Sequence, residues 1–374
     1  MYLENLKLGN FKTYGEVEVD FCRNVNCVVG NNGVGKTNLL DAVYYLSFCK
    51  SCFNNTDMLN IRYDEDFFAI HGLYDLDGEK VTVSCVQRRG QPKQVKWNRK
   101  VCKTFGEHIG RLPIVMVSPG DQGIILGGSD SRRKFVDGVI AQVDKNYLEH
   151  LLQYQKALEQ RNRLLKRFYE ERNWDETSIA VWDGQLVRHG EVLCSGRKDF
   201  MEGFLPLFEE YFAWITDGRE KSGVRYAPQS AEPLADQLMS ARQHDRYAQY
   251  TTVGPHKDDV ELTVNGMPVK RFGSQGQQKT FVLALKLAQF DYIYMHCGVK
   301  PILLLDDIFD KLDMTRVTQL VKLVGSDRFG QVFLTDTQQG RVERIFEEIP
   351  HVEHRIFSVA GNPAQVIQGG SNVQ

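Results

Sequence analysis

The sequence predicts an α/β fold in which a helical segment interrupts a core of sheet and helices. Near the N-terminus an apolar strand, a glycine-rich turn and a helix follow one another, and strands alternate with helices again towards the C-terminus. Between these parts the apolar residues recur at helical spacing. We therefore expect the two ends of the chain to share one sheet, with a helical arm inserted between them.

The N-terminal part of the core is expected to be rich in strands. Alternating apolar residues predict strands within 2–30, and the last of these is the apolar run Val25–Val29 before a glycine. Residues 36–48 have helical spacing, and 67–103 form a second β-rich stretch. This part is assigned to residues 1–128.

The helical arm is assigned to 129–245 and the C-terminal part of the core to 246–374. The helical pattern runs from 129 to 216, whereas 226–250 is polar and has no regular pattern. The expected later elements are a hairpin at 259–272 that turns at Asn265-Gly266, a helix at 279–296, a strand at 301–305, a helix at 314–324, a strand at 330–335 and a frayed tail.

Composition excludes several classes of protein. The chain has 374 residues, of which 42% are hydrophobic and 25% charged, and its net charge of -2 argues against a uniformly basic nucleic-acid binder. The sequence contains no apolar run of about 18 residues, so it predicts no membrane-spanning helix. The cysteines lack a disulfide framework, which predicts a cytoplasmic protein. Cys49 and Cys52 form a C-x-x-C that suits either a metal or redox site or two small residues ending a helix.

A phosphate-binding loop is the strongest motif. Residues 30–37 match G-x-x-x-x-G-K-[ST] between an apolar strand and a helix. The backbone N–H groups of such a loop point at phosphates, while Lys36 reaches the β/γ-phosphates and Thr37 holds Mg²⁺. The predicted ATP-binding residues here are Gly30, Asn31, Asn32, Gly33, Val34, Gly35, Lys36, Thr37 and Asn38.

Two carboxylates follow the apolar strand at 301–305. Asp306 is predicted to bind Mg²⁺, and Asp307 to orient or deprotonate the attacking water. A strand followed by an Asp-rich helix cap is the alternative. About 30 residues earlier, Ser274, Gly276 and Gln277 lie at a helix N-terminus, which suits either anion binding or an ordinary cap.

The chain resembles the RecF family of ABC-type ATPases over nearly its whole length. The motifs that carry the resemblance, in the family's order, are LKLGNFKTY, GNNGVGKTNLLDAVYYLS, LPIVMVSPGD, SRRKFVDGVI, QRNRLLK, VGPHKDD, GSQGQQKT and PILLLDDIFDKLD. The resemblance implies an ABC head domain like those of Rad50 and SMC proteins, with a β-rich lobe and a short helical arm. It also implies slow, DNA-stimulated ATP hydrolysis and an ATP-dependent homodimer that clamps DNA and, with RecO and RecR, supports RecA loading at gaps.

The family pattern also implies roles for individual residues. Lys36, Asp307 and Ser274 are the expected catalytic residues, with Ser274 and Gly276 acting across the dimer as the signature sequence. Asp313 corresponds to the acid of the D-loop. Most ABC ATPases have glutamate where this family and this chain have Asp307, so the shorter carboxylate needs a different geometry. Further roles, left open, are a Q-loop residue at Gln122 and phosphate sensing, or a plain strand end, at Thr335 and Thr337.

A basic hairpin within 87–103 is the predicted DNA-binding surface. It has no acidic residue, so it suits phosphate contacts, although a merely solvated hairpin is the alternative. The predicted DNA-binding residues are Arg88, Arg89, Lys93, Lys96, Arg99 and Lys100. A basic helix through Arg161 and Arg163 ranks below this hairpin because acidic residues alternate with its basic ones. His256 beside two aspartates is expected to form a turn rather than a metal or acid–base site.

Two other functions fit parts of the pattern. The ATPase subunit of a membrane transporter shares the loop and the carboxylates, but GSQGQQ differs from the usual LSGGQ signature. A non-hydrolysing scaffold would use bound ATP only to hold a shape for a partner.

Overall fold

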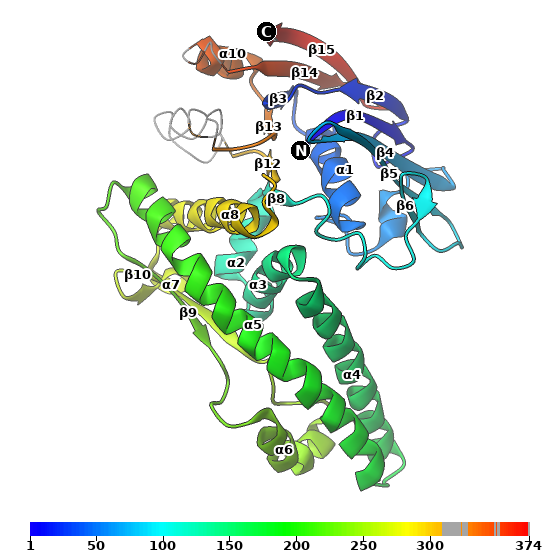
Figure 1. The fold of residues 1–374 in the computed structure, drawn as a ribbon, viewed down its shortest axis with the longest axis vertical. Coiled ribbons are helices and arrows are strands. Elements are labelled where there is room, and N and C mark those ends of the chain that lie inside the picture. The colour runs from blue at the N-terminus through cyan, green and yellow to red at the C-terminus, as the bar shows by residue number, and fades with distance from the viewer. Residues whose placement is uncertain (309–322, 324–327, 348, 350–351, 373–374) are drawn as a thin grey trace. The chain divides into compact units, whose positions relative to one another are not determined.

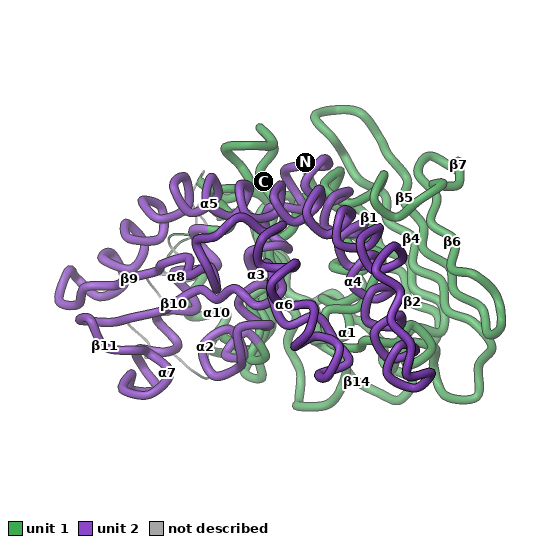
Figure 2. Tube along the Cα trace, turned by 90° about the horizontal axis from the view of Figure 1, so that it is seen from below, with its two compact units in different colours: residues 1–120, 289–374 green, residues 121–288 purple. Residues whose placement is uncertain are grey.

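The structure is a computed structural model that describes residues 1–308, 323, 328–347, 349 and 352–372. The chain forms two compact units, unit 1 (1–120 and 289–374) and unit 2 (121–288) (Figure 2). Residues 246–288 therefore group with the helical segment, whereas they were predicted to belong to the C-terminal part of the core. Asp313 and, except for Leu323, the expected helix at 314–324 lie outside the described residues.

The first sheet of unit 1 is antiparallel and has the strand order β2-β1-β4-β5-β6-β7. Its strands are β1 Tyr2–Gly9, β2 Glu16–Asp20, β4 Phe67–Leu76, β5 Glu79–Arg88, β6 Gln94–Trp97 and β7 Lys100–Val101. The β-rich stretch predicted at 67–103 corresponds to β4 through β7.

The second sheet of unit 1 has the strand order β15-β14-β3-β13-β12-β8 and is parallel apart from its edge strand β15. Its strands are β3 Val25–Val29, β8 Ile114–Val117, β12 Ile302–Leu305, β13 Val332–Asp336, β14 His354–Ala360 and β15 Gln365–Asn372. N-terminal β3 lies between C-terminal β13 and β14, so the prediction that both chain ends share one sheet is confirmed. Residues 369–372 of the tail expected to fray instead lie in β15, and 373–374 lie outside the described residues.

Helix α1 (Lys36–Phe48) packs into an apolar core that draws residues from both sheets of unit 1. The rings of Phe11, Tyr45 and Phe68 meet edge to face, with centroids 5.3 to 6.1 Å apart. These contacts fix the helix that follows the glycine-rich loop. Other short helices of the N- and C-terminal parts are α10 (Gln339–Glu347), η1 (Asp57–Asn60) and η2 (Pro119–Gln122).

Unit 2 is mainly helical, and its long helices α4 and α5 lie side by side (Figure 1). Its elements are α2 Gly123–Leu126, α3 Ser129–Val143, α4 Lys145–Glu170, α5 Glu176–Thr216, β9 Ser222–Ala227, α6 Leu234–Ala248, β10 Asp259–Val264, β11 Met267–Pro268, α7 Val269–Phe272 and most of α8 Gln275–Cys297. The hairpin turns at Asn265-Gly266 as expected, with φ of 50° and 77°. Of the described helices, none is long and apolar enough to cross a membrane.

Candidate functional site

The glycine-rich loop joins β3 to α1 in a conformation that requires glycine. Gly30 and Gly35 have φ of 155° and 115°, and a Cβ atom at Gly30 would lie 2.5 Å from the backbone oxygen of Val359. The Lys36 ammonium donates to the Gly30 and Asn31 carbonyl oxygens, at 2.9 and 3.0 Å. The loop and the N-terminus of α1 therefore present backbone N–H groups and one lysine at the same place.

The strand order brings the loop and the first predicted carboxylate together. Strands β3, β13 and β12 are parallel neighbours, so their carboxyl ends meet at one edge of the sheet. There the Thr37 hydroxyl contacts both carboxylate oxygens of Asp306 at 3.0 Å, although 269 residues separate the two. Burial raises the pKa of Asp306, and hydrogen bonds from Thr335 and Thr37 oppose that rise.

Thr335 lies in β13, between β3 and β12, and connects the two aspartates. Its hydroxyl donates to Asp306 Oδ1 at 2.9 Å and accepts from the backbone N–H of Asp307 at 2.8 Å. The side chain is fully buried. Asp307 has φ of 47°, in the left-handed region where Asp and Asn are tolerated better than longer residues. The short acid at this position therefore suits the local backbone.

The loop between β1 and β2 holds the phosphate-binding loop from one side, a role that was not predicted from sequence. Tyr14 Oη donates to the Gly35 carbonyl at 2.9 Å, and Asn38 Nδ2 donates to Thr13 Oγ1 at 3.0 Å. The Lys12 ammonium pairs with buried Asp41 of α1 at 2.6 Å. These contacts depend on how β1 and α1 pack, so the sequence could not predict them. The local motif NFKTY was the sequence signal for this loop.

The donor atoms at this edge fit a nucleotide with Mg²⁺. The hydroxyl of Thr37 and the carboxylate of Asp306 supply the hard oxygen ligands that Mg²⁺ prefers, and phosphates complete such sites. Lys36 supplies a cation next to the loop. Asp307 adjoins them through Thr335. The geometry thus gathers the residues that phosphate binding, metal binding and water activation need.

Comparison with known proteins identifies the family of the chain. Residues 2–356 match the family described as RecF/RecN/SMC N terminal domain. A DNA replication and repair protein RecF from Phocaeicola vulgatus is 46% identical over 96% of each chain. The chain belongs to the RecF family. Another RecF, from Parabacteroides distasonis, is 45% identical over 98% of this chain and 100% of its own.

Solved structures agree with this family. The structure described as the recombination mediator protein RecF-ATPrS in the RecFOR pathway has a TM-score of 0.88 and 30% identity, and it covers 99% of this chain and 98% of its own. An Smc head domain from Pyrococcus furiosus has a TM-score of 0.57 at 16% identity, over 99% of this chain and 96% of its own. The fold is therefore that of an ABC ATPase head related to SMC proteins.

Ser274 stands in unit 2 immediately before α8. Its backbone N–H donates to Gln277 Oε1 at 2.8 Å, and its hydroxyl accepts from the Gln277 N–H at 3.2 Å. This reciprocal pair is a capping box. Ser274 and Gly276 are nevertheless exposed, so the cap leaves them accessible to a second molecule. Gln122 is half-buried at the end of η2, and its role stays a prediction.

Five of the six predicted DNA-binding residues are available at the surface of the β5–β7 hairpins. In the described part of the chain we find no ion pair for the five, which are Arg88, Arg89, Lys96, Arg99 and Lys100. Lys93 differs because its ammonium bonds to Asp57 at 2.6 Å and lies over the rings of Tyr45 and Phe105. We therefore leave Lys93 out of the proposed DNA surface and keep the other five as the basic hairpin set.

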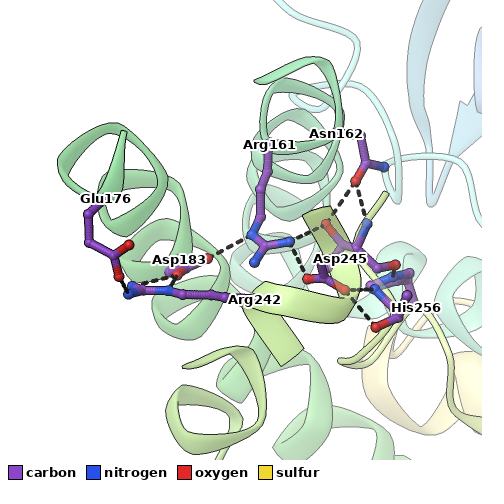
Figure 3. Close-up of polar contacts among 9 residues, drawn as sticks. Arg161, Asn162, Glu176, Asp183, Arg242, Asp245 and His256 are labelled. Atoms are coloured by element: carbon purple, nitrogen blue, oxygen red, sulfur yellow. Dashed lines mark hydrogen bonds and ion pairs between the residues drawn. The ribbon is translucent and has the colours of Figure 1, made fainter. Parts of the chain in front are cut away.

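The basic helix α4 is not uniformly exposed. Arg161 is fully buried, and its guanidinium bonds to Asp183 at 2.7 Å and to Asp245 at 2.6 Å (Figure 3). It therefore cannot contact DNA, contrary to its place in the second basic surface.

His256 packs nearby against Tyr154, whose hydroxyl lies 2.7 Å from Nδ1. Burial lowers the pKa of His256 to about 4. The ring is accordingly a neutral hydrogen-bonding group of the turn.

In the C-x-x-C, Cys49 is buried at the end of α1 and Cys52 is exposed.

Proposed function

We propose that this protein is an ATP-dependent, DNA-binding recombination mediator with slow ATPase activity. The observation that carries the proposal is the chain of contacts from Thr37 through Asp306 and Thr335 to Asp307 beside the phosphate-binding loop. Family membership supports the role in replication and repair, because the relatives are described as DNA replication and repair proteins.

In the proposed reaction the protein binds the nucleotide phosphates, holds the metal and deprotonates the attacking water. The loop N–H groups and Lys36 bind the phosphates, Thr37 and Asp306 hold Mg²⁺, and Asp307 accepts a proton from the attacking water. Bound Mg²⁺ would neutralise charge on the phosphates. Thr335 keeps the backbone of Asp307 in place. Thr37 and Asp306 would be the residues of the chain that hold Mg²⁺, which usually keeps several waters and also binds the phosphates of a nucleotide.

The site is proposed to be completed by a second copy of the chain. Ser274 and Gly276 are exposed at the N-terminus of α8, where partial positive charge favours the γ-phosphate of a partner's nucleotide. ATP then closes the homodimer and hydrolysis reopens it. The basic hairpin set would bind DNA phosphates without reading sequence. RecR and RecO, and through them RecA, are the proposed protein partners, since the similar solved structures belong to the RecFOR pathway.

The test is sedimentation velocity of Asp307→Asn protein with and without Mg-ATP. Asparagine tolerates the left-handed backbone at this position, so the variant removes the charge and preserves the fold. We expect a monomer that becomes a dimer only with Mg-ATP. Adding Ser274→Arg should abolish the dimer, whereas the matched change Ser240→Arg, at another exposed serine of unit 2, should not.

A monomer throughout, with ATP bound, would remove the clamp and favour the non-hydrolysing scaffold. Hydrolysis that persists in Asp307→Asn would contradict the role of Asp307 as the base.

A further inference from the structure

Two histidines face each other across the arm. His150 of α4 and His189 of α5 are 39 residues apart, yet their Nδ1 atoms are separated by 3.2 Å. The ring centroids are 4.9 Å apart and the ring planes are inclined by 65°. Both side chains are half-buried, so they are held by helix packing and remain reachable from solvent. The nucleotide and DNA sites proposed above use neither residue.

The contact between these rings has a specific protonation requirement. Two nitrogens at this distance need one Nδ1–H to donate and the other Nδ1 to accept. The accepting ring therefore already aims a lone pair into the space between the helices. If the donor ring carries its proton on Nε2 instead, both Nδ1 lone pairs face that space.

The distance between the two Nδ1 atoms matches the distance between two imidazole nitrogens that bind one metal ion. Zn²⁺ binds histidine nitrogen at about 2.0–2.1 Å in tetrahedral geometry, which places two such nitrogens about 3.3 Å apart. The observed 3.2 Å agrees with that spacing. Neutral imidazole is also the ligand type that Zn²⁺, Ni²⁺ and Cu²⁺ share.

The charges around the pair partly oppose each other. Burial, His150 and Arg188 lower the pKa of His189, whereas Glu149 raises it. Glu149 is exposed and precedes His150 on α4, so it acts on the pair as a nearby charge. Among the described residues we find no group of three or more His, Cys, Asp or Glu side chains already gathered around a metal position. Water would therefore complete the coordination, as in open sites.

We propose that His150 and His189 form a two-histidine site for a divalent transition-metal ion, Zn²⁺ in the first instance, that clips α4 to α5. A site with two protein nitrogens binds more weakly than a closed site with four ligands, so its occupancy follows the free metal concentration. Metal binding would then stabilise the arm only when the metal is available. The inference is independent of the proposed ATPase function.

The test is calorimetric titration of the full chain with ZnCl₂. A Cys52→Ser background removes the exposed thiol as a competing ligand. We expect one Zn²⁺ equivalent that is lost, or weakened at least about tenfold, in both His150→Gln and His189→Gln. His244→Gln, at an exposed histidine of α6, is the matched control and should bind Zn²⁺ as the parent does.

A further variant separates metal binding from packing. His150→Asn keeps a short polar group that can hydrogen-bond to His189, so the arm should fold normally by circular dichroism, yet it removes one imidazole ligand. Loss of the Zn²⁺ equivalent with intact folding supports the site. The same number of equivalents in the parent and in all histidine variants, or no binding by the parent at 100-fold excess of ZnCl₂ over protein, overturns it.

Discussion

At the residue scale, the site depends on Thr335 as much as on the two acids. Its single hydroxyl fills both of its hydrogen-bonding roles, donating to Asp306 and accepting from the Asp307 backbone. An unsatisfied buried polar group costs about 1–3 kcal/mol. Thr335 is therefore better described as a positioning residue than as the sensor of the γ-phosphate considered from sequence. Thr337, two residues on, lies beyond the end of β13.

Replacing Thr335 with valine should impair hydrolysis more than nucleotide binding. The Asp307 N–H loses its acceptor and Asp306 loses one donor, so we expect kcat to fall about tenfold to 100-fold, equivalent to about 1.4–2.8 kcal/mol. The nucleotide Kd should change less than threefold, because Lys36 and the loop are untouched. Steady-state ATPase assays and fluorescent-nucleotide binding measure the two effects.

Thr335→Ser is the control for this change because it retains the hydroxyl, and it should stay within threefold of the parent kcat. A valine variant that melts at a lower temperature but hydrolyses ATP at the parent rate would show that Thr335 has only a structural role.

At the element scale, α6 is a helix that hydrophobic periodicity does not predict. Its fully buried apolar residues are few, Leu234 and Leu238, and the segment was therefore assigned no regular structure. Ion pairs hold this helix instead, from Arg242 to Asp183 and from Asp245 to Arg161. Such partners are distant in sequence: Arg161 reaches Asp245 over 84 residues. A pattern read within one helix cannot reveal them.

Arg161→Met should strongly destabilise the arm. The change leaves Asp183 and buried Asp245 without their shared cation, and breaking a buried pair from one side costs about 3–5 kcal/mol. Arg163→Met on the same helix should cost less than about 0.5 kcal/mol, because its pair with Glu159 is exposed. Urea unfolding followed by tryptophan fluorescence reports mainly on the arm, since Trp174, Trp182 and Trp214 lie in unit 2.

The urea concentrations at the unfolding midpoints of the two variants should therefore differ clearly. Equal midpoints for Arg161→Met and Arg163→Met would mean that the buried network contributes no net stability.

At the scale of the whole molecule, sequence predicted the parts of the site that are contiguous and missed those made by packing. The residue order of the phosphate-binding loop and the apolar strand before Asp306 are local signals, and the shared sheet followed from β–α alternation. The contacts of Thr13 and Tyr14 with that loop arise only when β1 and α1 meet in unit 1. Lys93 shows the same limit, since only the fold brings Asp57 to its ammonium.

The basic hairpin set makes a prediction about the salt dependence of DNA binding by the intact protein with Mg-ATP. Arg99 and Lys100 are exposed at the β6–β7 turn, and each contact with a duplex phosphate contributes about 0.9 to the slope of log K against log salt. Replacing both with alanine should lower that slope by about 2, measured by fluorescence anisotropy with duplex DNA over a range of NaCl concentrations. Lys93→Ala should leave the slope unchanged and lower the melting temperature, because it removes the partner of Asp57. A double variant with the parent slope would place the DNA surface elsewhere and leave these charges a role in solubility.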